Sequence, residues 1–409
     1  GASRGAGRPA ANWFMERLID TAADQMGMDR LTLRKRNLIK PGQMPFDASS
    51  GMTYDSGDFP TVMTNALKLA DHAGFAKRKR ESRKNGKLRG IAVGAYLEVT
   101  APPSKELGKI TFDKDGGVTL TTGTLDYGQG HATPYAQVLA DRLGVPFEKI
   151  RLVQGDSDLV RAGNGTGGSR SITASGQAIV EASALVIEKG KQAAAQMLEA
   201  AEADIEFAGG RFTIAGTDRG IGIMDLAKKV HDGEAKDGPQ SLDVDHLSDD
   251  IQATFPNGCH IAEVEVDPLT GQVEVVKYTG VNDFGVVVNP MLVAGQVHGG
   301  VAQGIGQALM ENVTYDASGQ PVTGSFMDYA LPRAADVPSM VLDTHASPAT
   351  TNPLGTKGCG EAGCAGSLST IVNAVIDALS EYGVRELNMP LTSERVWQAI
   401  QNGQKSAAA

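Results

Sequence analysis

The stretch Asn352-Pro-Leu-Gly-Thr-Lys-Gly-Cys-Gly-Glu361-Ala-Gly-Cys-Ala-Gly366 decides how the rest of the chain is interpreted. It places one carboxylate, Glu361, among five glycines, and residues 367–379 continue it with apolar side chains at helical spacing. Glycines let a backbone approach a ligand closely, and the N–H groups that begin a helix favour negative charge. Two interpretations are open: a glycine-rich turn with a solvated Glu361, or a ligand-binding loop in which Glu361 is a general base.

The composition of the whole chain limits its partners. Its 409 residues are 41% hydrophobic and 21% charged, which is typical of a globular protein of two or three domains. The net charge of −10 disfavours a nucleic-acid partner, and no apolar run reaches the ~18–20 residues of a membrane span. The 50 glycines are clustered, which indicates tight turns around a large ligand.

Three cysteines, Cys259, Cys359 and Cys364, have no metal-type spacing and predict neither a metal site nor a disulfide framework. A chain without structural disulfides fits a reducing compartment, so we expect a cytoplasmic location. The periplasm stays an alternative, because the sequence does not begin with Met and any targeting segment would lie in a native start that this sequence does not include.

One order of elements occurs twice in the chain. Residues 109–122 and 261–278 have the pattern of hairpins, and each precedes a turn with a Gly-Gln pair and then a helix. The two predicted helices are residues 133–143 and 301–310. We therefore predict an α+β fold with duplicated hairpin–Gly-rich turn–helix units, at about 107–200 and 260–400, and a ligand in the cleft between them.

A basic run divides the chain. Lys77 to Arg89 holds eight basic residues and one acidic residue, Glu81. Because the chain around it is acidic, we interpret the run as a solvated connector and not as a nucleic-acid contact. It predicts a boundary between residues 1–85, the mostly helical end of a first lobe, and residues 86–409, a second lobe that contains the duplication.

Two more glycine-rich turns each open a predicted helix. Gly128-Gln129-Gly130-His131 suits cradling a phosphate or the edge of a pterin; the alternative is a strand-to-helix turn with His131 packed as a cap. Thr166-Gly-Gly-Ser-Arg-Ser171 adds hydroxyls and a guanidinium, which are components of a pyrophosphate site. It matches neither a P-loop nor a dinucleotide-binding fingerprint.

Polar side chains in two other segments give weaker signals. Four polar residues between Gln296 and Gln307 do not share one helix face, so we expect no metal site there. Two of them, His298 and Gln303, are assigned structural hydrogen bonds. Ser3-Arg4-Gly-Ala-Gly-Arg8 is either a simple turn or a loop whose arginines orient an anionic or carbonyl oxygen.

Taken together, these stretches resemble the molybdenum-binding large subunit of the xanthine oxidase family, which includes xanthine, aldehyde and carbon monoxide dehydrogenases and related hydroxylases. Six stretches in family order carry the resemblance: Ser3-Arg-Gly-Ala-Gly-Arg-Pro9, Gly128-Gln-Gly-His131, Gly165-Thr-Gly-Gly-Ser-Arg-Ser171, Gly295-Gln-Val-His-Gly-Gly300, Asp328-Tyr-Ala-Leu-Pro332 and Lys357-Gly-Cys-Gly-Glu361. They span nearly the whole chain but correspond to about the C-terminal half of such a subunit. The N-terminal half is then expected on a separate chain or on a missing part of this one.

The resemblance also implies the residues of a site. Glu361 matches the family's catalytic base, and Arg4 falls where xanthine-oxidising members keep a substrate-orienting arginine. The implied cofactor is molybdenum with molybdopterin cytosine dinucleotide. The residues implied in binding it are Gly128, Gln129, Gly130, His131, Thr133, Gly167, Gly168, Ser169, Arg170, Ser171, Gln296, Lys357, Gly358 and Gly360. Electrons would leave through an iron–sulfur subunit and an FAD subunit, since no cysteine pattern here could hold a cluster.

The activity implied by the resemblance is insertion of water-derived oxygen into an aldehyde or N-heteroaromatic C–H bond. Copper-containing carbon monoxide dehydrogenases of the family carry a cysteine directly after the arginine of the first loop, and this chain has Gly5 there. The lack of this cysteine disfavours carbon monoxide oxidation, and a carbon monoxide dehydrogenase-like subunit is kept as an alternative. A scaffold fragment that binds no cofactor is another; a different nucleotide-binding oxidoreductase would need a fingerprint that the sequence lacks.

Overall fold

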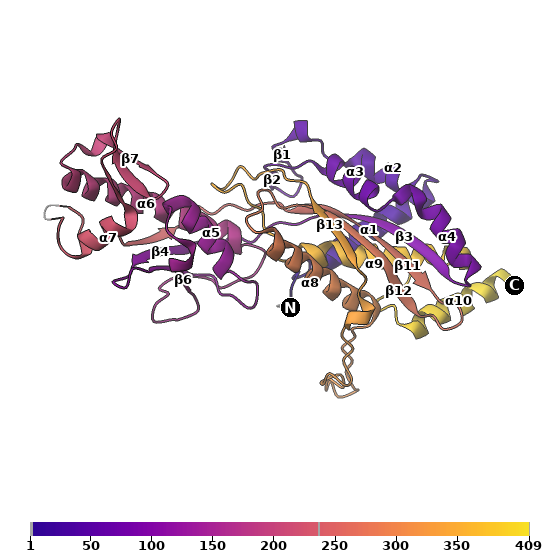
Figure 1. Cartoon of the computed structure of the whole chain (residues 1–409). Helices are drawn as coiled ribbons and strands as arrows, with labels where there is room; N and C mark the ends of the chain where they lie inside the picture. The colour runs from indigo at the N-terminus through magenta and orange to yellow at the C-terminus, as the bar shows by residue number, and fades with distance from the viewer. Residues whose placement is uncertain (1–2, 236–237, 409) are drawn as a thin grey trace.

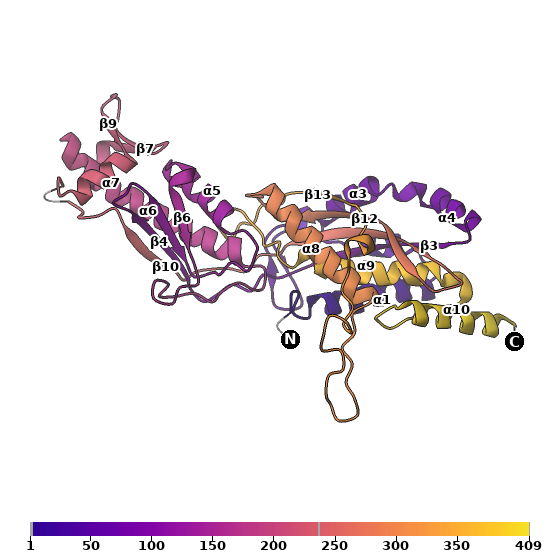
Figure 2. The ribbon, with the colours of Figure 1, turned by 60° about the horizontal axis from the view of Figure 1, so that its bottom comes forward.

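The protein, described here by a computed structural model, consists of two lobes side by side (Figure 1), and the structure describes residues 3–235 and 238–408. Residues 1 and 2 of the predicted first lobe and residue 409 of the predicted second lobe lie outside the described residues. Each lobe contains a four-stranded mixed sheet. The N-terminus lies near the junction of the lobes, and the C-terminus lies at the far end of one of them (Figures 1 and 2).

The smaller lobe is built around the first sheet. Its strands in spatial order are β10 (Val244–Ser248), β4 (Glu106–Phe112), β5 (Val118–Thr122) and β6 (Ile150–Val153). Helices α5 (Ala132–Leu143) and α6 (Ser171–Leu198) share its hydrophobic core. A peripheral unit adds β7 (Ile205–Ala208), β8 (Arg211–Ile214), β9 (Gly220–Gly222) and α7 (Ile223–His231).

The larger lobe is built around the second sheet. Its strands in spatial order are β13 (Met340–Thr344), β12 (Val273–Asp283), β11 (Asn257–Val266) and β3 (Leu88–Leu97). Two helices, α8 (Pro290–Leu309) and α9 (Ala362–Ala378), supply much of its core. The remaining helices and the small hairpin of this lobe are α1 (Arg8–Gln25), α2 (Arg30–Asn37), α3 (Phe59–Leu69), α4 (Phe75–Lys84), α10 (Ser393–Ala408), β1 (Phe46–Asp47) and β2 (Thr53–Tyr54). Among the described residues, no helix is both long and apolar enough to cross a bilayer.

The two sheets have the same topology. In each, an antiparallel hairpin leads through a helix to a strand that runs parallel to the second hairpin strand: β4–β5–α5–β6 and β11–β12–α8–β13. A long helix, α6 or α9, then follows and packs on the sheet. A duplicated unit would produce the same order of elements twice. The predicted bounds of the two units, 107–200 and 260–400, and the predicted lobe boundary at 85/86 stay predictions.

The lobes exchange one strand each. β3 precedes β4 in the chain but pairs with β11, and β10 precedes β11 but pairs with β4. The chain therefore crosses between the lobes twice, and the two crossing segments hydrogen-bond to each other. Glu98 N–H donates to the Pro256 carbonyl (2.8 Å), and Thr100 N–H donates to the Thr254 carbonyl (2.9 Å).

The glycines of the segment 295–300 have a different role from the predicted one. We expected a turn there and a helix from residue 301, but α8 begins at Pro290, with the Asn289 side chain as its cap, and runs through the segment. A Cβ on Gly300 would meet Gly363 Cα of α9 at 2.8 Å. Gly300 therefore allows two helices to pack closely, and Gln296 lies in a helix and not in a turn.

Helix α9 is buried on nearly every side, which agrees with side chains that are mostly apolar or small. A Cβ on Gly363 would meet the Val297 carbonyl oxygen at 2.4 Å, and one on Gly366 would meet His260 Nδ1 at 2.4 Å. Close contacts on two faces fix the position of the helix. Its N-cap residue, Glu361, is therefore held on a rigid element.

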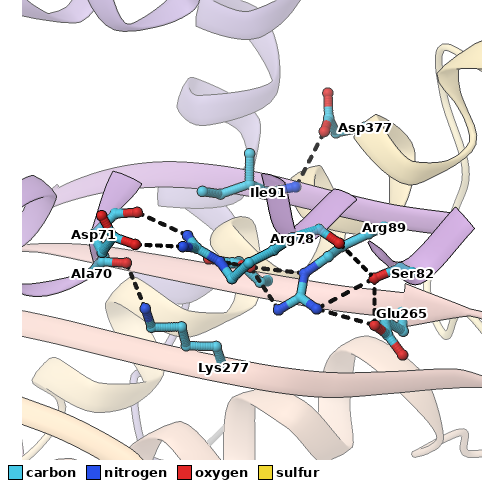
Figure 3. A network of polar contacts seen from close by, with 10 residues as sticks. Ala70, Asp71, Arg78, Ser82, Arg89, Ile91, Glu265, Lys277 and Asp377 are labelled. Atoms are coloured by element: carbon cyan, nitrogen blue, oxygen red, sulfur yellow. Dashed lines mark hydrogen bonds and ion pairs between the residues drawn. The ribbon is translucent and has the colours of Figure 1, made fainter. Parts of the chain in front are cut away.

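The interpretation of the basic run as a solvated connector is wrong for two of its arginines. Arg78 on α4 and Arg89 on β3 both bind the buried carboxylate of Glu263, at 2.6 and 2.7 Å. Figure 3 shows Arg78 also reaching Asp71, and Arg89 reaching Ser82 and Glu265. These pairs attach α4 to the sheet, because a buried carboxylate requires charged partners.

Candidate active site

A cavity of about 700 Å³ lies where segments of both lobes meet. Its wall includes the N-terminal loop at Ser3 to Ala6, parts of segments 127–135 and 166–172 from the smaller lobe, and parts of segments 284–296 and 357–361 from the larger lobe. This size is in the usual range for a small-molecule or cofactor site. The glycine-rich stretches singled out in the sequence thus meet in one place.

Four helices begin at the wall of this cavity. The lining residues His131, Ser171, Asn289 and Glu361 stand at the starts of α5, α6, α8 and α9. Only α8 has a side-chain cap; the N-terminal N–H groups of the other three receive no capping side chain. Because uncapped helix N-termini favour anions, the wall suits a ligand with phosphate groups.

The Glu361 carboxylate is held in the cavity wall and is only 6% exposed. Its Oε1 accepts a hydrogen bond from Gly5 N–H (2.8 Å), and its Oε2 lies 2.9 Å from Ser169 Oγ. Arg8 adds a positive charge 3.6 Å from Oε1. A carboxylate fixed in this way by three segments has the setting of a positioned general base.

Arg4 and Gln296, both predicted site residues, contact each other. Arg4 donates to the Gln296 side chain (3.0 Å) and carbonyl (2.8 Å) and to the Gly360 carbonyl (2.6 Å). Gln303 donates to the Arg4 carbonyl (3.1 Å), which confirms its structural assignment. These bonds hold the guanidinium at the wall of the cavity, against the carbonyl of the residue that precedes Glu361.

The turn at 128–131 differs from its predicted phosphate-cradling form. The carboxylate of Asp126 accepts the N–H groups of Gly128, Gln129, Gly130 and His131, at 2.7 to 3.2 Å. Those four donors are therefore engaged within the turn itself. Gly128, Gln129 and His131 still line the cavity, whereas Gly130 and Thr133 are not among its lining residues.

The imidazole of His131 packs on Tyr135, with ring centroids 5.1 Å apart, and burial lowers its pKa. This arrangement agrees with the alternative of a packed histidine at the start of a helix.

The segment 165–171 contributes main chain and hydroxyls to the wall, but not its cation. Gly167, Gly168, Ser169 and Ser171 line the cavity. The Arg170 side chain instead donates to the Asn164 carbonyl (2.6 Å) and is absent from the described lining residues. Ser169 takes a left-handed conformation (φ 55°), which is uncommon for a residue other than glycine and aims its hydroxyl at Glu361.

Lys357 and Gly358 serve mainly as supports. The Lys357 ammonium forms a fully buried ion pair with Asp283 (2.7 Å) and donates to the Ser56 carbonyl (3.2 Å). Gly358 is not among the lining residues, but a Cβ on it would meet the Ser169 carbonyl oxygen at 1.8 Å. Only glycine at this position lets the two loops approach closely enough to bring Ser169 to Glu361.

Sequence reasoning missed two carboxylates at this site. Asp126 fills the 128–131 turn, and Glu98 lies behind Ser169, with its side chain fully buried. Burial raises the pKa of Glu98 from 4.5 to about 8. A single glutamate among apolar residues gives no sign of its own environment; here the crossing of the chain between the lobes, directly after β3, encloses it. The sequence signal for Asp126 was an aspartate two residues before Gly128, the pattern of an Asx turn.

Comparison with known proteins identifies the family. Residues 65–338 match the molybdopterin cofactor-binding domain, and residues 1–38 match a second domain of the same description. The chain belongs to the molybdenum-binding large subunits of the xanthine oxidase family. The resemblance in sequence motifs is confirmed, and so is the mixed α and β fold.

Three relatives give the extent of the similarity. The carbon monoxide dehydrogenase large chain of Hydrogenophaga pseudoflava is 34% identical over 95% of this chain and 50% of its own length. The nicotine 6-hydroxylase large subunit of Paenarthrobacter nicotinovorans is 34% identical over 98% and 51%. The solved structure of carbon monoxide dehydrogenase from Oligotropha carboxidovorans has 30% identity and a TM-score of 0.91, and covers 98% of this chain and 52% of that chain. The chain thus spans about half the length of the curated relatives that it matches.

Proposed function

We propose that the chain supplies the catalytic base and much of the cofactor cleft of a molybdenum hydroxylase. The observation that carries the proposal is the placement of the Glu361 carboxylate in the wall of a cavity at which four helices begin. When bound, molybdopterin cytosine dinucleotide with its molybdenum supplies the two-electron redox chemistry. Glu361 lies beyond both matched domain ranges, and the base role comes to it from the resemblance of its own motif, Lys357 to Glu361.

The residues present fit such a group. The uncapped start of α6, with the hydroxyl of Ser171, is the proposed support for the pyrophosphate. Gln129 from the smaller lobe and Gln296 from the larger lobe also line the wall. The main chain at Gly167 and Gly168 lets a planar ligand approach closely. We assign Arg170, Thr133, Gly130, Gly358 and Lys357 to the support of these elements and not to ligand contact.

Glu361 is proposed to accept a proton from the oxygen that attacks the substrate carbon. Gly5 N–H and Ser169 Oγ each bind one carboxylate oxygen, so the group keeps its orientation while each oxygen retains a free lone pair. Arg4, fixed by Gln296 and the Gly360 carbonyl, is proposed to orient the substrate from the same wall. Orientation of this kind lowers the entropy cost of the chemical step.

An aldehyde or an N-heteroaromatic compound is the proposed substrate class. Gly5 has φ +98°, and a Cβ on it would meet Pro9 Cγ at 2.6 Å and Cys364 Sγ at 3.2 Å, so this loop has no room for a cysteine in its present form. That disfavours the copper-dependent alternative, carbon monoxide oxidation. One relative is named as a nicotine 6-hydroxylase, which fits the N-heteroaromatic class.

The proposed partners are the remaining half of the large subunit, an iron–sulfur subunit and an FAD subunit. The half-length match to the relatives supports the first of these. A cytoplasmic location stays a prediction.

The deciding experiment substitutes Glu361→Gln in the native complex that contains this chain. We expect molybdenum and pterin contents close to those of the wild type and a loss of turnover of about 10²–10⁴-fold, the usual contribution of a general base. Glu188→Gln, an exposed carboxylate on α6, is the matched control and is expected to retain wild-type turnover. Turnover of Glu361→Gln within a few fold of the wild type would refute the base assignment.

Metal analysis and released-pterin fluorescence on the same complex separate the proposal from its rivals. An absence of both molybdenum and pterin would leave the scaffold fragment as the better account. Stoichiometric copper would contradict the role assigned to Gly5. A substrate panel of aldehydes, N-heterocycles and carbon monoxide, with an artificial electron acceptor, then tests the substrate class directly.

A further inference from the structure

We propose that Glu98 is a positioning residue that holds a proton at neutral pH and, through Ser169, keeps Glu361 ionised and oriented. The inference rests on the proposed function, in which Glu361 is the base. Glu98 is absent from the described lining residues of the cavity; it follows β3 on the first crossing segment, and Ser169 Oγ lies within hydrogen-bond distance of both carboxyl groups.

The contacts of Ser169 Oγ require a proton on one of the two carboxyl groups. This oxygen lies 2.7 Å from Glu98 Oε1 and 2.9 Å from Glu361 Oε2, and it accepts the Glu361 N–H at 3.0 Å. A hydroxyl donates one hydrogen bond and accepts two. It can therefore donate to one carboxyl group only, and the other must donate to it as a carboxylic acid.

The charges around Glu98 and Glu361 also indicate that one of the two carboxyl groups holds a proton. Arg8 is the cation that faces both carboxyl groups, 3.7 Å from Glu98 and 3.6 Å from Glu361. Three other titratable groups face Glu98, one phenol and two thiols. All three are neutral, because burial raises their pKa, for the two thiols to about 12. These groups are Tyr96, Cys359 and Cys364. Arg4 lies at the same wall, but its guanidinium binds the Gln296 side chain and the carbonyls of Gln296 and Gly360, and among the described residues it forms no ion pair with either carboxylate. Arg8 therefore balances one carboxylate, and a second buried negative charge would have no counter-ion in contact with it.

Glu98 is the better place for the proton of the two. Its side chain is fully buried, whereas that of Glu361 is 9% exposed. Glu361 also accepts the Gly5 N–H, while Glu98 Oε2 has no hydrogen-bond partner in the part of the chain that the structure describes. An unpaired oxygen costs less free energy on a neutral acid than on a carboxylate. Ser169 then donates to Glu361 and accepts from Glu98.

The pH dependence of stability gives the first test, and its sign follows from the pKa of Glu98. The folded value, about 8, lies above the ordinary value of 4.5, so the native chain holds one more proton than the unfolded chain between these pH values. The stabilisation by this group is complete below pH 4.5 and is lost as pH rises through 8. In Glu98→Gln we expect the unfolding of the full chain to lose a pH dependence that corresponds to up to one proton over this range.

Infrared spectroscopy of the full chain gives the second test and needs neither cofactor nor turnover. At neutral pH, the wild type minus Glu98→Gln difference spectrum should contain the band of a protonated carboxyl group. Glu106 is a matched control, because burial raises its pKa to about 7 while Gly123 N–H and Ser175 Oγ bind its Oε1. Glu106→Gln is expected to remove its own band and to leave that of Glu98. A Glu98 difference spectrum with only a carboxylate band at neutral pH would overturn the proposal.

Glu361→Gln tests whether the two groups are coupled, and it remains informative if Glu98→Gln does not fold. Without the negative charge of Glu361, the Glu98 band should disappear at a lower pH than in the wild type, because a like charge disfavours ionisation. An unchanged titration would show that burial alone retains the proton and would refute the coupling. A complex that lacks molybdenum but retains this coupled titration would refute the proposed function and leave the carboxyl pair standing.

Discussion

Asp126-Tyr127-Gly128 and Asp283-Phe284-Gly285 are the same kind of tripeptide at corresponding places in the two sheets, yet they lie in opposite environments. Each comes after or at the end of the second hairpin strand and before a helix that begins at the cavity. Tyr127 is 65% exposed, whereas Phe284 is 2% exposed. A short motif therefore does not determine its own burial; the elements packed around it do.

The two aspartates differ in the reach of their bonds. Asp126 binds N–H groups of its own turn only, from Gly128 to His131. Asp283 is fully buried and binds Gly285 N–H, Ser347 N–H, the Asn257 amide and the Lys357 ammonium, so it ties together four segments of the larger lobe. The part of the cavity wall next to Asp126 is thus held together by its own turn, whereas the part next to Asp283 belongs to the core of the larger lobe. The matched substitutions below test this difference.

The largest effect is expected from loss of the buried charge. Asp283→Asn keeps an oxygen acceptor but leaves the Lys357 ammonium without a counter-ion, which costs about 3–5 kcal/mol of unfolding free energy. Asp126→Asn removes a charge that is partly solvated and is expected to cost about 1 kcal/mol. Denaturant unfolding of both variants measures the difference; equal costs would mean that the two turns are equally independent of the core.

The aromatic side chains are expected to give the next largest contrast. Phe284→Ala should cost about 3 kcal/mol, the lower end for this substitution, because the ring borders the cavity and part of the space is already open. Tyr127→Ala should change the unfolding free energy by less than about 0.5 kcal/mol, since the side chain is exposed. A cost above about 2 kcal/mol for Tyr127→Ala would place this turn in the core after all.

The glycines give the smallest contrast. A Cβ on Gly285 (φ 59°) would meet the Gly355 carbonyl oxygen at 2.2 Å, so Gly285→Ala forces the backbone to shift and should cost about 2–3 kcal/mol. A Cβ on Gly128 (φ 109°) would meet nothing within 4 Å, and Gly128→Ala should cost only the backbone strain, about 1 kcal/mol. Thermal unfolding of the two variants side by side is sufficient, and a reversed order would contradict the packing of residue 285.

Much of the site could be predicted from the sequence, because its signals are local. The glycines around Glu361 and the apolar segment after them predicted a loop and a helix, and α9 begins at residue 362. The paired hairpins were also visible, since strand alternation is a short-range pattern.

What could not be predicted depends on contacts between distant segments. Gly300 serves helix packing against α9, and nothing in the sequence around it distinguishes that use from a turn. Arg78 looked solvated because its partner Glu263 lies far along the chain. Glu98 is enclosed only after the chain has crossed between the lobes.

The exchange of β3 and β10 has a consequence for assembly of the fold. The larger sheet is not complete until the chain has passed through the whole smaller lobe, because β3 pairs with β11, so this sheet depends on long-range closure and should form slowly. A fragment of residues 106–243 would lack β10 and expose the edge of β4, and an exposed strand edge promotes aggregation. All four strands of the smaller sheet lie between residues 106 and 248, so the smaller lobe is expected to form before the larger one is complete.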